Sequence, residues 1–213
     1  MTESGTGIVE LWPTPLYIAD QAEQSGREEV AEMNAQLRDL ILNAEARDDG
    51  AFNFGMIGAQ KSSIDLLRWE HPAVEWLRSR LLSAVRDLSR ATLGGQAETA
   101  TSYPVQAEGW AVVYHEGASH KQHTHHDSVW SGTYYVATGG VDAGAGHLQL
   151  LDPRPGAIAR SASPGVGYVR PFPGLLVVFP SWLPHSVKAT LSATGEPRIG
   201  VAFNVTYDLE PAA

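Results

Sequence analysis

The chain contains 213 residues, 43% of them hydrophobic and 18% charged, which is enough for one well-packed domain. Its 24 acidic and 15 basic residues give a formal net charge of −9. This balance argues against nucleic-acid and anionic-membrane partners, because both require a basic surface. The absence of cysteine excludes iron–sulfur clusters, thiolate zinc sites, disulfide bonds and cysteine nucleophiles. No apolar run is long enough to cross a bilayer and no signal-peptide pattern is present, so we expect a cytoplasmic protein.

The N-terminal part of the chain is predicted to be mainly helical. Residues 12–18 contain two prolines, which favour an extended strand. Apolar side chains then recur every three or four positions over residues 27–48, the spacing of an amphipathic helix. Residues 50–64 are expected to form a loop or a short strand. A second amphipathic helix is predicted from Pro72 to the glycine pair at 94–95.

The C-terminal part is predicted to be a β-structure. Trp110, Val112 and Tyr114 alternate with their neighbours as in a strand, and turn residues separate several further candidates. No alternation of strands and helices appears, so we expect an antiparallel jelly-roll, a mostly β fold with flanking helices. The further strand candidates are residues 131–137, 147–151, 174–180, 186–190 and 198–207.

These elements are expected to form one domain over residues 1–213. The strand and the two helices within residues 1–99 would buttress a jelly-roll core at residues 100–213. No internal repeat or linker divides the chain.

Histidine is the most informative residue type. Five of the eight histidines lie within twelve positions, namely His115, His120, His123, His125 and His126. In a strand, side chains two apart share a face, so His123 and His125 are suited to bind one metal ion. The same spacing relates His125 to Asp127. A solvated polar loop is the alternative interpretation of this cluster.

A third candidate ligand comes from later in the chain. His185 follows a strongly apolar strand, and a late histidine beside two early ligands would give a facial set with open positions, as in non-haem Fe(II) oxygenases. Thirteen residues later, Arg198 could hold a carboxylate co-substrate through two parallel hydrogen bonds. A surface ion pair is the alternative role for this arginine.

Together these residues resemble the 2-oxoglutarate/Fe(II)-dependent oxygenases, and more narrowly a bacterial family of such oxygenases formerly catalogued as conserved hypothetical proteins. The similarity covers most of the chain. It is carried by residues 12–17, Gly117 with His123 and His125, residues 131–136, Asp152-Pro153-Arg154, residues 179–185 and residues 198–204.

The resemblance implies a double-stranded β-helix core, a cupin-like jelly-roll, that holds Fe(II) with 2-oxoglutarate beside it. It implies O2-dependent hydroxylation or another oxidation of a small molecule, with release of succinate and CO2. Two ligand sets stay open, either His123, His125 and His185 or His125, Asp127 and His185. Arg198 would bind the distal carboxylate of 2-oxoglutarate. The residues expected to line the co-substrate pocket are Tyr114, Ser131, Tyr135 and Asn204.

Two other functions compete with this one. A three-histidine site approaches that of the cupins, which would make the chain a metalloenzyme that does not use 2-oxoglutarate. A non-catalytic jelly-roll binding module is the second alternative. A homodimer and a monomer are both compatible with the sequence.

Overall fold

A computed structural model describes residues 13–45, 55–93, 105–140, 145–160, 164–192 and 194–207. Its helices are α1 (Gln21–Ser25), α2 (Arg27–Glu45), the 3-10 turn η1 (Leu66–Arg68), α3 (Pro72–Leu93) and α5 (Pro155–Ala159). The first five strands are β1 (Tyr17–Asp20), β2 (Met56–Lys61), β3 (Val105–His123), β4 (Trp130–Thr138) and β5 (Leu148–Leu151). The last four are β6 (Val166–Val169), β7 (Leu175–Pro180), β8 (His185–Val187) and β9 (Arg198–Tyr207).

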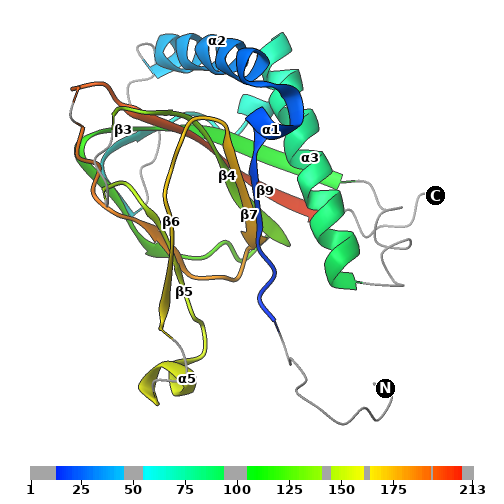
Figure 1. Ribbon diagram of the computed structural model, residues 1–213, viewed down its shortest axis with the longest axis vertical. Coiled ribbons are helices and arrows are strands. Elements are labelled where there is room, and N and C mark those ends of the chain that lie inside the picture. Colours follow the sequence, from blue (N-terminus) through cyan, green and yellow to red (C-terminus); the bar gives the residue numbers. More distant parts are fainter. Residues whose placement is uncertain are drawn as a thin grey trace.

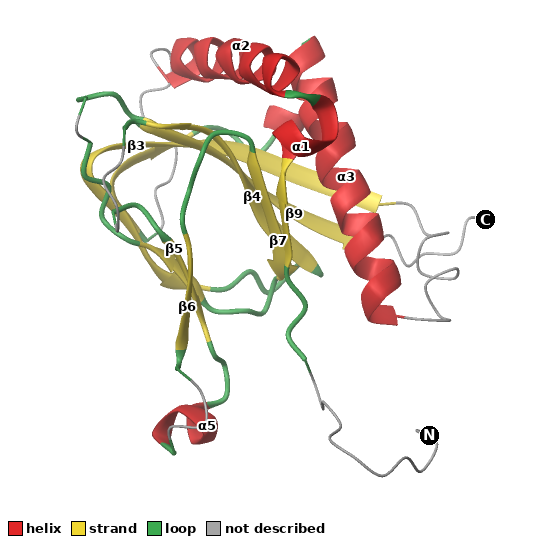
Figure 2. Cartoon of the chain, viewed as in Figure 1, coloured by secondary structure: helices red, strands yellow, loops and turns green. Residues whose placement is uncertain are grey.

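The strands form a curled antiparallel sheet with α1, α2 and α3 gathered on one side of it (Figure 1). Its order is β1-β7-β4-β9-β3-β8-β5-β6, and β2 pairs with β3. The paired strands β5 and β6 extend away from the helices, and the short α5 lies at the end of this arm (Figure 2). This is the predicted mostly β, jelly-roll type of core.

The long strand β3 joins the two walls of the curled sheet. Its first half, Val105 to Tyr114, pairs with β9, and its end pairs with β8 through His120 and His123. Gly117 lies between the two halves with a φ of 76°, a left-handed conformation that glycine adopts without strain. The bend therefore brings a histidine-rich strand end toward β8 while the start of the same strand stays on β9.

Alternation along β9 separates two apolar clusters. Ile199, Val201 and Phe203 face the helices and belong to the cluster that includes the buried stripe of α3. Residues 198, 200, 202 and 204 face the other way, into the curl of the sheet. The second cluster fills that inner side with Trp110 and other apolar residues. The helices thus cover the outer face, and the inner face is left for the site.

The helix predictions agree closely with the structure, because their apolar spacing matches what is buried. Val74, Leu77, Leu81, Val85 and Leu88 of α3 are all buried. Helix α2 begins at Arg27 as predicted, and its predicted end beyond residue 45 lies outside the described residues.

Several strand predictions were too short or missing. β3 extends well beyond residues 110–114, since its polar end pairs with β2 and β8 rather than turning into solvent. β1 begins at Tyr17, and the prolines precede it. β6, α1 and α5 had not been predicted, because each spans only four or five residues.

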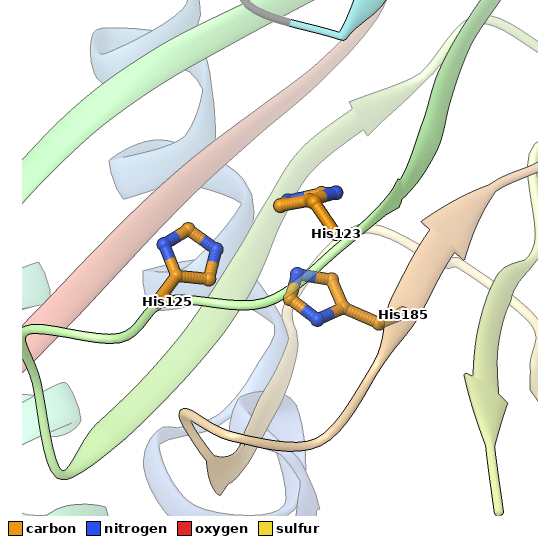
Figure 3. A group of neighbouring side chains, drawn as sticks. All are labelled: His123, His125 and His185. Carbon is orange, nitrogen blue, oxygen red and sulfur yellow. The ribbon is translucent and has the colours of Figure 1, made fainter. Parts of the chain in front are cut away.

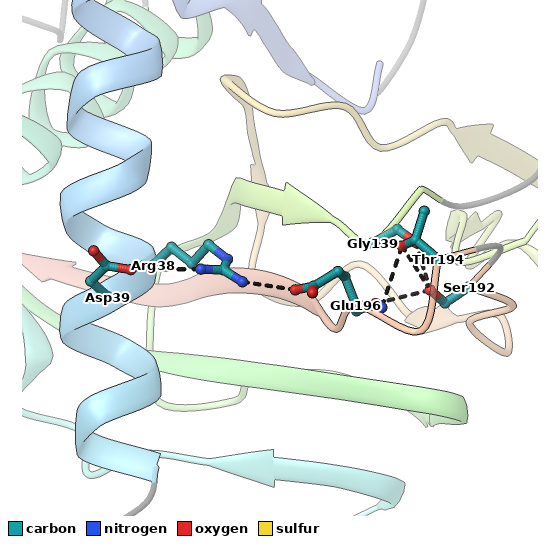
Figure 4. A network of polar contacts seen from close by, with 6 residues as sticks. All are labelled: Arg38, Asp39, Gly139, Ser192, Thr194 and Glu196. Atoms are coloured by element: carbon teal, nitrogen blue, oxygen red, sulfur yellow. Dashed lines mark hydrogen bonds and ion pairs between the residues drawn. The ribbon is translucent and has the colours of Figure 1, made fainter.

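A polar network ties α2 to the segment that leads into β9 (Figure 4). Arg38 of α2 donates to Glu196 at 2.7 Å. The Ser192 and Thr194 hydroxyls donate to the Gly139 carbonyl at 2.6 and 3.0 Å. These contacts hold the chain two residues before Arg198, the first residue of β9.

In the described part of the chain, no helix combines the length and apolarity needed to cross a membrane.

Candidate functional site

His123 and His185 are brought together by strand pairing. They are direct partners in the antiparallel register of β3 and β8, and their ring centres lie 4.2 Å apart. Side chains of directly opposed residues share one face of the sheet. His185 is the first residue of the three-residue strand β8. Its pairing with His123 therefore sets the face of the sheet on which the His185 side chain lies.

His125 lies just beyond β3, in a turn that the segment between β7 and β8 holds in place. The His125 amide donates to the Ser181 carbonyl at 2.9 Å, and the Ser181 amide donates to the Val129 carbonyl at 3.1 Å. The Ser181 hydroxyl also donates to the Ser128 carbonyl. Ser181 therefore connects the turn that carries His125 with the segment that carries His185.

The three imidazoles converge on one point (Figure 3). One ligand nitrogen from each of His123, His125 and His185 lies within 4.8 Å of the others, so the group could hold a metal ion. His123 Nδ1 contacts the Lys121 carbonyl at 2.8 Å, and His185 Nδ1 contacts the Leu183 carbonyl at 2.9 Å. Because a carbonyl only accepts, each Nδ1 must donate, which leaves Nε2 of both rings with a free lone pair.

Burial keeps these rings neutral, the form that binds metals. Desolvation lowers the pKa of His185 to about 3 and that of His125 to about 4, and nearby histidines add to the effect. The pKa of His123 is lowered mainly by burial as well. At neutral pH the group therefore offers three unprotonated nitrogens and does not have to lose protons to a metal.

The other members of the histidine-rich segment lie apart from this group, except for one. Asp127 is exposed in the turn and is not part of the metal-suited group found among the described residues. His126 contacts the Thr124 hydroxyl, and His115 pairs with Glu45. His120 stacks on His123 with ring centres 3.9 Å apart.

A cavity lies beside the three histidines, and a buried arginine forms part of its wall. Arg198 is 2% exposed, and its guanidinium lies over the rings of Tyr114 at 4.4 Å and Tyr135 at 5.1 Å. Its Nε and Nη1, and the hydroxyl of Tyr135, have no hydrogen-bond partner in the described structure. Burial raises the pKa of both tyrosines, and the arginine charge opposes that rise. Polar groups this deeply buried call for a polar ligand.

Ser131 also lines the cavity, and it pairs with Asn204 farther along the inner face. They are partners in the register of β4 and β9, and the Ser131 hydroxyl donates to Asn204 Oδ1 at 2.8 Å. Asn204 is six residues from Arg198 on the same face of β9, a distance of about 20 Å along an extended strand. The structure thus places Tyr114, Tyr135 and Arg198 together and puts Asn204 elsewhere.

Sequence reasoning did not identify Lys61, which lies in the region expected to be a loop or a short strand. It is the last residue of β2, and its Nζ lies 4.2 Å from the centre of the Trp110 ring. Trp110 lines the cavity, and its ring centre is 6.0 Å from that of His125. In the sequence, the one indication that Lys61 faces inward is that it lies two positions after the apolar Ala59. One such pair of residues is not enough to predict a strand.

The segment that carries these residues is similar to a known protein family. Residues 108–204 match the family model described as "Putative 2OG-Fe(II) oxygenase". No protein of curated function matches the chain by sequence. The matched segment contains all three histidines and Arg198. The resemblance to 2OG-Fe(II) oxygenases, which are oxidoreductases, is therefore confirmed.

Solved structures share the fold. A Pseudomonas putida prolyl-4-hydroxylase is 18% identical with a TM-score of 0.63, and the match covers 91% of this chain and 92% of that one. HygX from Streptomyces hygroscopicus, with nickel and 2-oxoglutarate bound, is 14% identical with a TM-score of 0.58, over 92% and 84% of the two chains. A Trichoplax adhaerens prolyl hydroxylase in complex with a hypoxia-inducible factor peptide is 15% identical with a TM-score of 0.58, over 90% and 83%. The predicted fold class is confirmed.

Proposed function

We propose that this chain, whose residues 108–204 match the 2OG-Fe(II) oxygenases, is a non-haem Fe(II)/2-oxoglutarate-dependent dioxygenase that hydroxylates or otherwise oxidises a small molecule. The observation that carries the proposal is one cavity whose wall contains two unlike groups. Three neutral imidazoles that converge on one point line it, and so does a buried arginine with unpaired donors.

The residues fit Fe(II) and 2-oxoglutarate by their chemistry. Imidazole nitrogens suit iron, and three of them leave coordination positions open. The Arg198 guanidinium can donate two parallel hydrogen bonds to a carboxylate. Its Nε and Nη1 have no hydrogen-bond partner within the described residues, so donors are available for a ligand. In this assignment His123, His125 and His185 hold the metal, and Arg198 with Tyr135 holds the distal carboxylate of the co-substrate.

Bound Fe(II), together with 2-oxoglutarate and O2, would supply the oxidising chemistry, with succinate and CO2 as co-products. The chain's own residues bind and orient. The Nδ1 hydrogen bonds of His123 and His185 fix their rings, and the rings of Tyr114 and Tyr135 pack against the Arg198 guanidinium. The ring centre of Phe179 lies 4.8 Å from that of His185. Phe179 also lines the cavity, so it covers that side of the His185 imidazole against water.

Ser131 and Asn204 are assigned to the substrate side rather than to 2-oxoglutarate. The reason is distance. Asn204 lies about 20 Å from Arg198 along β9, which is longer than a five-carbon diacid held by Arg198. We also propose a small-molecule substrate, a cytoplasmic location and a single oxygenase-like domain over residues 1–213.

The test is a spectroscopic titration without oxygen. Adding Fe(II) and then 2-oxoglutarate to the protein should produce the weak visible charge-transfer band of the chelate, and His185→Ala should give no band. Iron uptake with no response to 2-oxoglutarate would contradict the proposal and favour a cupin-like three-histidine metalloenzyme. Failure to take up any metal would favour a non-catalytic binding module.

A further inference from the structure

We propose that Lys61 is a specificity-determining residue at the mouth of this site, where its ammonium group binds a carboxylate or another anionic group of the substrate. The inference rests on the proposed function, because it names the class of molecule that the oxygenase would accept. Lys61 belongs neither to the three-histidine group nor to the group of buried side chains around Arg198.

Strand register places Lys61 on the inner side of the curled sheet. It pairs with Val112 of β3, and Ala59, two residues earlier, pairs with Tyr114. Ala59, Val112 and Tyr114 all belong to the inner apolar cluster. Side chains two apart share a face, so Lys61 projects toward the cavity side and not toward the solvent-facing side of β2.

Trp110 fixes where the ammonium group lies relative to the metal-suited histidines. Lys61 Nζ is 4.2 Å from the centre of the Trp110 ring, and that ring centre is 6.0 Å from the His125 ring centre. Because both distances are measured to the Trp110 ring, the distance from Lys61 Nζ to the His125 ring centre cannot exceed their sum. Its charge also acts on both His123 and His125. A lysine this close can hold one end of a small substrate whose other end lies at the metal.

No ion pair within the described residues occupies the Lys61 ammonium group, so it is available to bind an anionic substrate. Within the described residues, no carboxylate lies within ion-pair distance of it, and no acidic residue lines the cavity. The exposed Glu108 acts on it only from farther away. Lys61 is half-buried, and its pKa is lowered mainly by desolvation, a cost that a bound anion would offset.

Packing of the lysine stem on an aromatic ring is the competing explanation, and the chain offers a matched control for it. Lys188 also lies over an aromatic ring, with its Nζ 5.2 Å from the centre of the Tyr168 ring. Tyr168 lies on β6 and Lys188 follows β8, and the ring under Lys188 does not line the cavity, whereas Trp110, the ring under Lys61, does. A role in packing alone predicts the same behaviour for both lysines.

The experiment uses the fact that the chain has only three lysines, Lys61, Lys121 and Lys188. Reductive methylation with 13C-formaldehyde keeps their charge and gives one NMR signal for each, assigned with Lys→Arg variants. The protein is loaded with zinc, a redox-silent metal, and with 2-oxoglutarate. It is then titrated with the straight-chain carboxylates from propanoate to octanoate and phenylacetate, and in parallel with the primary amide of each.

The carboxylates should shift the Lys61 signal at concentrations about fivefold lower than their amides, because a charged acceptor binds an ammonium more strongly than a neutral one. Neither of the other two signals should respond. Lys61→Met should abolish the preference as judged by ligand-observed NMR, Lys61→Arg should keep most of it, and Lys188→Met should leave it unchanged. Glu108→Gln should strengthen carboxylate binding, since it removes a competing charge.

The proposal is overturned if no carboxylate in the panel is preferred over its amide, or if Lys188→Met has the same effect as Lys61→Met. It is also overturned if 2-oxoglutarate itself shifts the Lys61 signal and displaces the carboxylate probes, because Lys61 would then bind the co-substrate. Metal and 2-oxoglutarate binding are measured on the same samples. A carboxylate preference in a protein that binds no 2-oxoglutarate would count against the proposed function and not against Lys61.

Discussion

His123 and His185 stand directly opposite one another in the register of β3 and β8, although 62 positions separate them in the chain. A one-residue shift of either strand would turn one of the two imidazoles to the other face of the sheet. The pairing thus makes the candidate metal site a product of strand register, and it leads to the first prediction.

Replacing His123 or His185 with Ala should weaken zinc or cobalt(II) binding by at least about 100-fold, because each removes one of three ligands. Isothermal titration calorimetry on the purified variants measures this. Asp127→Ala is the control and should change the affinity by less than about twofold, since this exposed carboxylate lies outside the group. Loss of metal binding in Asp127→Ala with retention in His123→Ala would instead support the set His125, Asp127 and His185.

Arg198→Lys should lower the affinity for 2-oxoglutarate by about tenfold or more while metal binding stays intact. Lysine keeps the charge but cannot donate two parallel hydrogen bonds, and it lacks the planar group that packs against the rings of Tyr114 and Tyr135. Anaerobic titration of the iron-loaded protein with 2-oxoglutarate measures the change. Unchanged affinity would exclude Arg198 from the co-substrate site.

Asn204→Ala should leave 2-oxoglutarate affinity within about twofold of the parent, because Asn204 lies about 20 Å from Arg198 along β9. The same titration checks this. A loss as large as that of Arg198→Lys would show that the co-substrate reaches the pair formed by Ser131 and Asn204.

Gly132→Ala should destabilise the protein by about 1–3 kcal/mol, the usual cost of overpacking. A Cβ at this position would lie 2.3 Å from the Phe203 ring and 2.4 Å from the Val177 carbonyl oxygen. Urea unfolding at neutral pH gives the free energy. Gly156→Ala is the control, because a Cβ there meets nothing within 4 Å, and it should be close to neutral. Equal stability of both variants would mean that β4, β7 and β9 are not packed as described.

The stability of the protein should fall as the pH rises above 10, and Tyr134→Phe should make that fall shallower. Burial raises the pKa of Tyr134 above the ordinary value of about 10, and its hydroxyl donates to Asn34 Oδ1 at 2.7 Å. The folded state therefore keeps this proton while the unfolded chain loses it. The stabilisation is complete below pH 10 and declines above it by up to about 1.4 kcal/mol per pH unit.

Urea unfolding between pH 7 and pH 11 measures this slope. Tyr134→Phe should also be less stable at pH 7 by about 1–3 kcal/mol, because it leaves Asn34 buried with an unmatched acceptor. The exposed Tyr168→Phe variant is the control for loss of a tyrosine hydroxyl, and its free energy of unfolding at pH 7 should be close to that of the parent. An unchanged slope in Tyr134→Phe would contradict the prediction.

The helices and the inner and outer strand faces could be predicted because their signal is local. The stripe from Val74 to Leu88 repeats at helical spacing, and α3 buries the residues that this spacing selects. The three histidines and Arg198 could be singled out by residue type and by motif, before any position in space was known. Their roles as ligands and as carboxylate partner stay predictions until the variants are measured.

Only the tertiary structure decided which of these residues meet. The bend of β3 at Gly117 and the register of β8 bring His123 to His185, and a hydrogen bond to Ser181 holds His125 beside them, while Asp127 stays in solvent. Lys61 lies over Trp110 of the cavity wall because β2 pairs with β3, a contact between segments about 50 residues apart. Residue type and periodicity are local properties, which the sequence determines by itself. Strand register depends on packing across the whole sheet, and for that reason it was settled only in the folded chain.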